Sequence, residues 1–290
     1  MSDPVAPLHV AVLGLGTMGR GIATAALGAG HAITGFDPQA AARDGAPAHV
    51  AAALDRAAAK GRLDAAAARA AADRFTVQDA AAPAVQHADL VIEAASEDAD
   101  VKTALWRDVG PAAPAGALLA SNTSSLSITA LGAASGAPER FAGLHFFHPV
   151  SALALVELVR GAHTLDGTLD ALEAFATGLG KTPVRCDDRP GFLVNRLLIP
   201  YLNEAAALAD EGHATPQAID DAMTLGANLP IGPLALIDAV GADVVLAIME
   251  TLHAEFGDPK YRPAPGLRRQ VRAGRLGRKS GAGYHPYDDA

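Results

Sequence analysis

Two histidines and a glutamate stand in apolar surroundings within the stretch GLHFFHPVSALALVELV. Residues of these types can bind a metal or move protons. His145 and His148 are three residues apart, a spacing that places both on one face only in a helix. Pro149 follows at once and disfavours helical geometry there, and the aromatic neighbours favour a strand. On a strand the two imidazoles point in different directions, so we expect no metal site.

Glu157 interrupts the second apolar run of this stretch. A buried carboxylate is costly unless a partner compensates it. Both runs are short and are joined by a turn that contains Pro149, so they can lie side by side and bring Glu157 to His145. A histidine held by a carboxylate is a common general base. The alternative is a structural buried pair, and the stretch by itself favours neither.

The segment VAVLGLGTMGRGIA places Gly14, Gly16 and Gly19 between a predicted strand and a predicted helix. This spacing suits a loop that holds a dinucleotide pyrophosphate at a helix N-terminus. Asp37 ends the next predicted strand, where a carboxylate accepts hydrogen bonds from a ribose and repels a 2′-phosphate. The combination predicts NAD rather than NADP as cofactor. The alternative is a glycine-rich turn with a surface aspartate.

Length and composition limit the classes of protein that the chain can represent. Its 290 residues, 50% of them hydrophobic, suit one large or two medium domains. A single cysteine excludes a disulfide framework and a multi-cysteine zinc site. The net charge of −9 argues against nucleic acid as the main partner. There is no signal-peptide pattern and no apolar run long enough to span a bilayer, so we expect a cytoplasmic protein without a membrane partner.

Short apolar runs alternate with helical patterns over the first two-thirds of the chain. The predicted strands are residues 8–13, 32–36, 89–94, 117–121, 141–147, 153–159 and 182–186. This alternation predicts an α/β fold with a doubly wound, mainly parallel sheet of Rossmann type. Residues 38–74 hold two Ala-rich helical patterns and no strand pattern, which predicts a helical hairpin that projects from the sheet.

The pattern changes near Asp187, and no strand pattern follows. We therefore expect an NAD-binding domain of residues 1–186 and an all-helical domain of residues 187–290.

The first helix of this second domain is expected to begin at Pro190 and to end at Gly212. It is apolar almost all round, which predicts burial on most faces, and Pro200 is expected to kink it. Thr215 is expected to cap the helix that follows.

Several long motifs together resemble one family over nearly the whole chain. They are VLGLGTMGRGIA, ADLVIEAASE, LLASNTSSLSIT, RFAGLHFFHPV, LVELVRG, PGFLVNRLLIPYLNEA, LGANLPIGPLALIDAVG and EFGDPKYRPAPGLRRQVRAGRLGRKSG. The sequence resembles the 3-hydroxyacyl-CoA dehydrogenases, and most closely the bacterial 3-hydroxybutyryl-CoA dehydrogenases. The resemblance implies NAD-dependent oxidation of a short-chain (S)-3-hydroxyacyl-CoA, in β-oxidation or butanoate metabolism, by a homodimer that associates through its helical domain.

The resemblance also implies roles for individual residues. His145 matches the base that takes the 3-hydroxyl proton, and Glu157 matches the carboxylate that orients it. Ser124 matches a serine that binds substrate and cofactor, and Asn195 matches an asparagine that reaches the substrate carbonyl. The residues expected at the cofactor are Gly14, Gly16, Thr17, Met18, Gly19, Asp37, Glu97, Lys102, Asn122, Ser124 and His148, with Glu97 and Lys102 at the nicotinamide ribose.

Two positions depart from the family pattern. The family usually has asparagine at the position of His148 and lysine at that of Ala154, and no physical reason for either change is evident. Lys60 and Arg62, at the tip of the predicted hairpin, are expected to reach the phosphates of CoA. Residues 268–279, with six basic side chains and no acidic one, are a second candidate. Solvated surface is the alternative for both.

Other functions fit the same scaffold. The substrate could be 3-hydroxyadipyl-CoA, or a free hydroxy acid or sugar acid. The chain could also be a non-enzymatic NAD-binding protein, against which the complete set of His145, Glu157, Ser124 and Asn195 argues.

Overall fold

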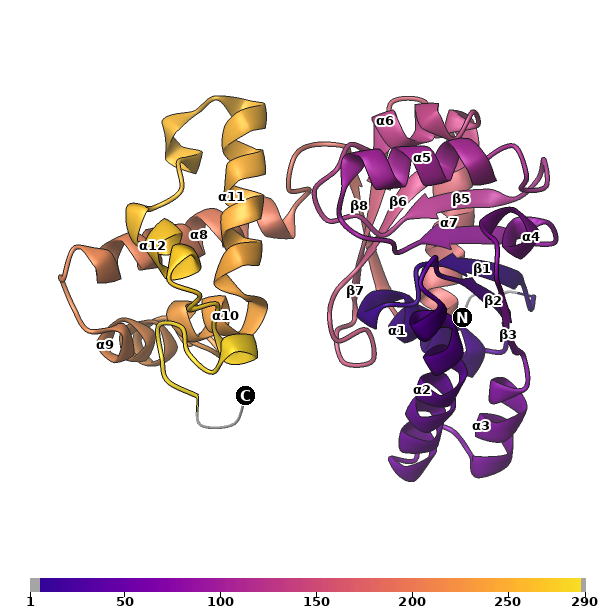
Figure 1. Cartoon of the computed structure of the whole chain (residues 1–290), viewed down its shortest axis with the longest axis horizontal. Helices are drawn as coiled ribbons and strands as arrows, with labels where there is room; N and C mark the ends of the chain where they lie inside the picture. The colour runs from indigo at the N-terminus through magenta and orange to yellow at the C-terminus, as the bar shows by residue number, and fades with distance from the viewer. Residues whose placement is uncertain (1–5, 288–290) are drawn as a thin grey trace. The chain divides into compact units, whose positions relative to one another are not determined.

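The structure is a computed structural model that describes residues 6–287. The chain divides into two compact units, Met1–Arg189 and Pro190–Ala290, called here the sheet unit and the helical unit (Figure 1).

The sheet unit is built on an eight-stranded sheet with the strand order β3-β2-β1-β4-β5-β6-β7-β8. The strands are β1 His9–Leu13, β2 Ala32–Phe36, β3 Phe75–Gln78, β4 Leu90–Glu93, β5 Leu118–Ser121, β6 Phe141–Phe146, β7 Leu155–Arg160 and β8 Thr182–Asp187. Every neighbouring pair is parallel except β6 and β7, which are antiparallel. The predicted mainly parallel, doubly wound sheet is confirmed.

Helices connect the strands and cover the sheet (Figure 1). They are α1 Thr17–Gly28, α2 Ala40–Ala59, α3 Ala65–Ala72, α4 Ala81–Val85, α5 Ala99–Val109, α6 Ile128–Ala134 and α7 Asp166–Gly178, with a short 3₁₀ helix at Pro138–Arg140. Ala142 and Leu144 lie in the core that includes residues of α1 and α7. Phe141 alternates to the opposite face, where its ring meets buried Trp106 of α5 at 4.7 Å. Among residues 6–287, no helix is long and apolar enough to cross a membrane.

The predicted helical hairpin is formed by α2 and α3, which run side by side (Figure 1). Its buried residues, among them Val50 and Leu54, belong to the same core as Ile22 of α1. Residues 75–78, which directly follow, form the edge strand β3, which the sequence analysis missed. This strand has only four residues and alternates between half-buried and exposed side chains, so its apolar signal is weak.

The helical unit contains five α-helices in the residues that the structure describes. They are α8 Val194–Asp210, α9 Pro216–Asp221, α10 Pro233–Val240, α11 Ala242–Phe256 and α12 Pro265–Arg272. A π-helical turn at Ala222–Gly226 and 3₁₀ helices at Pro259–Tyr261 and Arg278–Ser280 complete the unit. Its core is a separate cluster that α8, α10, α11 and α12 share, with Leu202, Leu234 and Met249 fully buried. The predicted cap is confirmed, because the Thr215 hydroxyl accepts a hydrogen bond from the backbone N–H of Ala218.

The expected start of α8 is wrong. The helix begins at Val194 rather than at Pro190, because Gly191 and Phe192 have φ angles of +77° and +46°, outside helical geometry. Its burial on most faces is as expected, because only Leu197, Glu204 and Asp210 of the helix are exposed. Leu197 is 75% exposed, and Leu193, just before the helix, is 42% exposed.

The end of the helical unit is fastened to the fully buried carboxylate of Asp238. This carboxylate accepts hydrogen bonds from the backbone N–H groups of Tyr284 and His285 at 2.9 and 2.8 Å. The hydroxyl of Tyr287 donates to it at 3.1 Å. Gly283 lets the chain approach, since a Cβ there would lie 1.9 Å from a carboxylate oxygen.

We expect Asp238→Ala to lower the free energy of unfolding by roughly 2 to 4 kcal/mol, because it leaves two backbone donors and a hydroxyl without their acceptor. Calorimetry of the full chain measures the effect. Asp170→Ala, which removes an exposed ion pair with Arg185, is the control and should have little effect. Equal stability of the two variants would contradict the assignment.

Candidate active site

The loop between β1 and α1 has the geometry of a phosphate-binding turn. Gly14 has a φ of +99°, and a Cβ on it would lie 2.5 Å from the carbonyl oxygen of Ala94. A Cβ on Gly19 would lie 1.8 Å from the carbonyl oxygen of Gly14, so α1 can pack against the loop only with glycine there. A Cβ on Gly16 would have no neighbouring atom within 4 Å. This opening, at the N-terminus of α1, fits the approach of a dinucleotide pyrophosphate.

Asp37 follows β2 directly and is 9% exposed. Its carboxylate accepts hydrogen bonds from the backbone N–H of Leu15 at 2.8 Å and of Gln39 at 2.9 Å. It therefore fastens the glycine loop to the end of β2. Thr17 and Met18 form the first turn of α1, where Thr17 is exposed and Met18 is half-buried.

Antiparallel pairing of β6 and β7 places His145 directly opposite Glu157. The Nδ1 atom of His145 lies 2.7 Å from a carboxylate oxygen of Glu157. The two residues are 6% and 1% exposed, and the ring centroid of Phe147 lies 4.4 Å from that of the imidazole, with the two rings tilted by 49°. The structure thus brings together the two groups that the sequence suggests as an acid–base pair.

His148 does not join this pair. It lies beyond the end of β6, is exposed, and is linked to Pro149 by a cis peptide bond. Ala154 is exposed just before β7, and its carbonyl oxygen accepts the backbone N–H of Thr182 at 2.8 Å. Nothing in these surroundings explains either departure from the family pattern.

The segment after β5 carries Ser124 and is held by Glu97. One Glu97 oxygen accepts the backbone N–H of Ser124 at 2.7 Å and the Thr123 hydroxyl at 2.6 Å. The Ser124 hydroxyl lies 3.2 Å from the same oxygen. The Asn122 side-chain oxygen accepts the backbone N–H of Phe146 at 2.8 Å, which ties this segment to the end of β6 beside His145.

Lys102 lies beneath this segment and is only 1% exposed. Its Nζ atom is 3.3 Å from Glu97 and 2.5 Å from Glu93, a fully buried carboxylate at the end of β4. Burial by itself would raise the pKa of Glu97, but the Lys102 ammonium and hydrogen bonds from Thr123 and Ser124 outweigh burial, so the pKa is lowered.

Glu93 was not among the site residues expected from the sequence. The available signal was a carboxylate that closes the apolar run LVIE at the carboxyl end of a strand.

The basic residues at the tip of the hairpin differ in their surroundings. Both are exposed, but Lys60 only follows the end of α2, whereas Arg62 also donates a hydrogen bond to the carbonyl oxygen of Ser151 at 3.2 Å. Lys181 donates to the carbonyl oxygen of Leu153 at 2.8 Å, in the same turn between β6 and β7. Burial and, secondarily, the positive charge of Arg62 lower the pKa of Lys181. The hairpin tip thus contacts the turn that follows His145.

Asn195 is the second residue of α8 and is 9% exposed. It belongs to the helical unit, whereas His145, Glu157 and Ser124 belong to the sheet unit. Its part in the active site is therefore a proposal.

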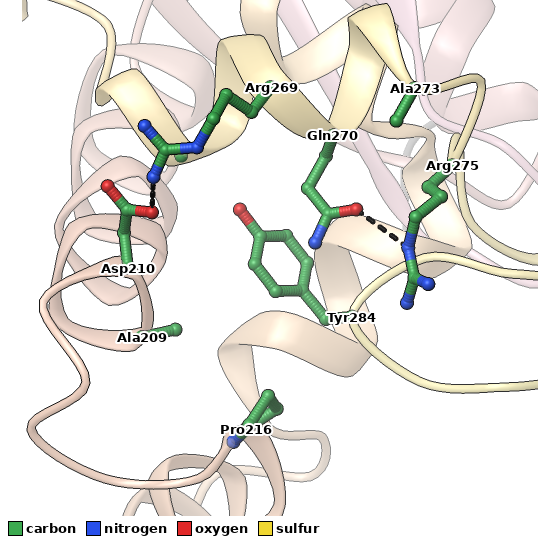
Figure 2. Close-up of a pocket in the computed structure, with 9 residues that line it drawn as sticks. Ala209, Asp210, Pro216, Arg269, Gln270, Ala273, Arg275 and Tyr284 are labelled. Carbon is green, nitrogen blue, oxygen red and sulfur yellow. Dashed lines mark hydrogen bonds and ion pairs between the residues drawn. The ribbon is translucent and has the colours of Figure 1, made fainter.

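A separate hollow of about 290 Å³ lies within the helical unit (Figure 2). Its charged side chains are already paired, Arg269 with Asp210 and Arg275 with Gln270. The hydroxyl of Tyr284 points into the space between these pairs and has no hydrogen-bond partner in the described structure. Burial, followed by the charge of Asp238, raises the pKa of Tyr284, so the hydroxyl stays protonated. The hollow lacks an acid–base pair and is not the candidate active site. Within residues 6–287 no cluster of three metal-ligating side chains is present.

A dinucleotide loop on the same sheet edge as a histidine held by a carboxylate is the equipment of a nicotinamide-dependent dehydrogenase. The family model described as 3-hydroxyacyl-CoA dehydrogenase, NAD binding domain, matches residues 9–189. The model of the C-terminal domain of the same family matches residues 191–287. The chain belongs to the 3-hydroxyacyl-CoA dehydrogenase family and is an NAD-dependent oxidoreductase.

Individual relatives agree with the family assignment. The chain is 42% identical over 281 residues to a probable 3-hydroxybutyryl-CoA dehydrogenase of Bacillus subtilis, covering 97% of this chain and 98% of the relative. It is 45% identical to a protein of the same description from Deinococcus radiodurans, covering 95% and 99%. The crystal structure of (S)-3-hydroxybutyryl-CoA dehydrogenase from Ralstonia eutropha is 45% identical and superposes with a TM-score of 0.93, covering 97% and 99%.

We expect Gly16→Ala to weaken NADH binding by roughly tenfold while the protein stays folded, because the methyl group enters the space that the pyrophosphate needs. Fluorescence titration with NADH measures this. Gly167→Ala is the control, since Gly167 in α7 also has open surroundings. Unchanged affinity in the Gly16 variant would place the cofactor elsewhere.

We expect the unmodified protein to prefer NADH over NADPH by roughly tenfold or more in kcat/KM, because the Asp37 carboxylate repels a 2′-phosphate. Asp37→Ala should narrow this preference. Asp44→Ala, which removes an exposed carboxylate on α2, should not change it. Equal use of both cofactors by the unmodified protein would refute the role of Asp37.

Proposed function

We propose that the protein interconverts short-chain (S)-3-hydroxyacyl-CoA and 3-oxoacyl-CoA, with 3-hydroxybutyryl-CoA as the preferred substrate. The names of the relatives at 42% and 45% identity support the choice of substrate. The observation that carries the proposed chemistry is the buried contact of 2.7 Å between His145 and Glu157. The proposed setting is fatty acid or butanoate metabolism in the cytoplasm.

In the proposed mechanism His145 is the general base. Its Nδ1 atom is held by Glu157, so Nε2 takes the proton of the 3-hydroxyl group during oxidation. The carboxylate fixes the tautomer and stabilises the imidazolium that forms. Bound NAD supplies the hydride acceptor. In the reverse direction the imidazolium returns its proton to the 3-oxo group, so oxidation requires neutral His145 and reduction requires the charged form.

Ser124 and Asn195 are proposed to position the substrate. Ser124 is on the segment that Asn122 ties to β6, which supports a hydroxyl contact near His145. Asn195 is proposed to bind the thioester carbonyl. Lys60 and Arg62 are proposed to bind CoA phosphates, and the exposure of both residues supports this.

The cofactor is proposed to lie along the carboxyl ends of the strands, with its pyrophosphate at residues 14–19 and its nicotinamide end near Ser124. Glu97 and Lys102 are proposed to position the nicotinamide ribose, with Glu97 as the accessible member because its side chain is 39% exposed. His148 is proposed to face the nicotinamide from the turn after β6.

One assay tests the proposed substrate. Acetoacetyl-CoA with NADH should be turned over rapidly, as followed by the loss of NADH absorbance. Free acetoacetate, which lacks the CoA portion, should react poorly, and 3-oxoadipyl-CoA should react more slowly than acetoacetyl-CoA. A higher kcat/KM for either of these two compounds would reassign the substrate.

We expect His145→Gln to lower kcat by roughly a hundredfold or more, a usual scale for a general acid–base group, and Glu157→Gln to have a smaller effect in the same direction. Steady-state kinetics with acetoacetyl-CoA measure both. His163→Gln is the matched control, because His163 is exposed in the same unit. A near-normal kcat for His145→Gln would refute the assignment.

The protein is proposed to be a homodimer that associates through the helical unit. The exposure of Leu197 on α8 and of Leu193 just before it supports this proposal, because a second copy would cover these apolar side chains.

We expect Leu197→Glu to convert the dimer to a monomer, because it places a charge at the proposed interface. Sedimentation at micromolar concentration measures the change. Leu165→Glu is the control, since Leu165 is 59% exposed in the sheet unit and should leave the dimer intact. A monomeric unmodified protein would contradict the proposal.

A further inference from the structure

Glu93 is a fully buried carboxylate that the proposed mechanism does not use. One of its oxygens accepts the backbone N–H of Ala95 at 2.7 Å and the Lys102 ammonium at 2.5 Å. The other oxygen accepts the Ser121 hydroxyl at 2.6 Å. A buried ionised carboxylate is costly unless donors compensate its charge, and these three donors do so.

Glu93 connects the two segments that hold the cofactor and Ser124. Its hydrogen bond to Ala95 fixes the turn after β4, against which Gly14 packs so closely that a Cβ would lie 2.7 Å from the Ala95 nitrogen. On the other side, the Ser121 hydroxyl accepts the backbone N–H of Thr123, at the start of the Ser124 segment, at 3.2 Å.

The charges around Glu93 do not cancel. The cluster contains two carboxylates, Glu93 and Glu97, and one ammonium, Lys102, and therefore carries a net charge of −1. Glu97 is ionised because Lys102 and the donors of the Ser124 segment face it. Glu93 and Lys102 are at most 1% exposed, so solvent screens their charges weakly, whereas the Glu97 side chain is 39% exposed at the surface of the site.

We propose that Glu93 is a positioning residue that shares the Lys102 ammonium with Glu97 and so leaves the site with a surplus negative charge, which favours the cationic ring of NAD⁺ over the neutral ring of NADH. This inference rests on the proposed placement of the nicotinamide end beside Glu97 and Ser124. Glu93 acts through Lys102 and Ser121 and does not touch the cofactor.

The ratio of the Kd of NAD⁺ to the Kd of NADH isolates this effect. NAD⁺ and NADH carry the same phosphates and riboses and differ by one positive charge on the nicotinamide ring. A variant that only loosens the fold weakens both alike and leaves the ratio unchanged. A variant that removes negative charge near the ring weakens NAD⁺ more than NADH.

Glu93→Gln is the first test, because the amide keeps the volume and removes the charge. We expect the Kd of NAD⁺, measured by calorimetric titration, to rise roughly threefold to tenfold relative to the Kd of NADH. Glu93→Asp keeps the charge and should keep the ratio, even if both affinities fall. Asp170→Asn is the control, because it removes one charge from an exposed ion pair on α7 and should leave the ratio unchanged.

The double variant Glu93→Gln, Lys102→Met tests whether Glu93 acts through charge. It restores the net charge to −1, so the ratio should return to that of the unmodified protein. Thermal unfolding checks that each variant is folded. If the single variant does not fold, the double variant still tests the proposal, since it removes the ammonium that would be left without Glu93. The proposal is overturned if the folded double variant shifts the ratio of the two Kd values as far as Glu93→Gln does. If the single variant is unfolded, any shift of this ratio in the double variant overturns the proposal.

Glu97→Gln separates failure of this inference from failure of the proposed site. If Glu97→Gln shifts the ratio and Glu93→Gln does not, the role of Glu93 is wrong and the proposed placement of the cofactor stands. If neither variant shifts the ratio, the nicotinamide end does not lie beside this cluster, and both proposals are overturned.

Discussion

The reversal of chain direction between β6 and β7 is the constraint on which the arrangement of the site depends. All other neighbouring strands in the sheet are parallel, and a parallel connection requires a long crossover. The turn between β6 and β7 instead returns the chain at once, so His145 and Glu157 become direct cross-strand partners twelve residues apart. The same turn meets the tip of the helical hairpin through Arg62. One antiparallel pair therefore fixes the histidine, its carboxylate and the neighbouring turn.

Buried charge is the second organising feature of the sheet unit. Glu157, Glu93 and Lys102 are each at most 1% exposed, and each has a partner of opposite charge or a hydrogen-bond donor within 3 Å. Loss of a partner of such a group destabilises the fold, so the geometry of the site and the stability of the core depend on the same residues. The His145–Glu157 pair and the Glu93–Lys102 pair are linked through Asn122, whose side chain joins the Ser124 segment to β6.

Much of this architecture could be predicted from the sequence because it depends on local rules. The glycine spacing and the strand-to-helix order indicated the loop at residues 14–19, and the isolated Glu157 indicated a partner for His145. The edge strand Phe75–Gln78 was missed because four half-exposed residues have little periodicity. The start of α8 was misplaced because the left-handed φ of Phe192 is not encoded by a glycine at that position.

Long-range polar contacts also could not be predicted from the sequence. Nothing local indicates that Asp238 holds a segment 46 residues further along the chain, or that Lys102 is buried rather than exposed on its helix. Sequence patterns report which face of an element is apolar, and they do not report which distant donor a buried carboxylate will meet.

The double role of Asp37 has a consequence for redesign of cofactor choice. The carboxylate that would discriminate between the two cofactors also accepts the amide of Leu15, and so helps to shape the loop that receives either cofactor. Removing the side chain would relax selectivity and loosen the loop together. A designer who wants the enzyme to accept NADPH would do better to begin with asparagine, whose oxygen can still accept the Leu15 amide without a charge, and to add a cation nearby afterwards.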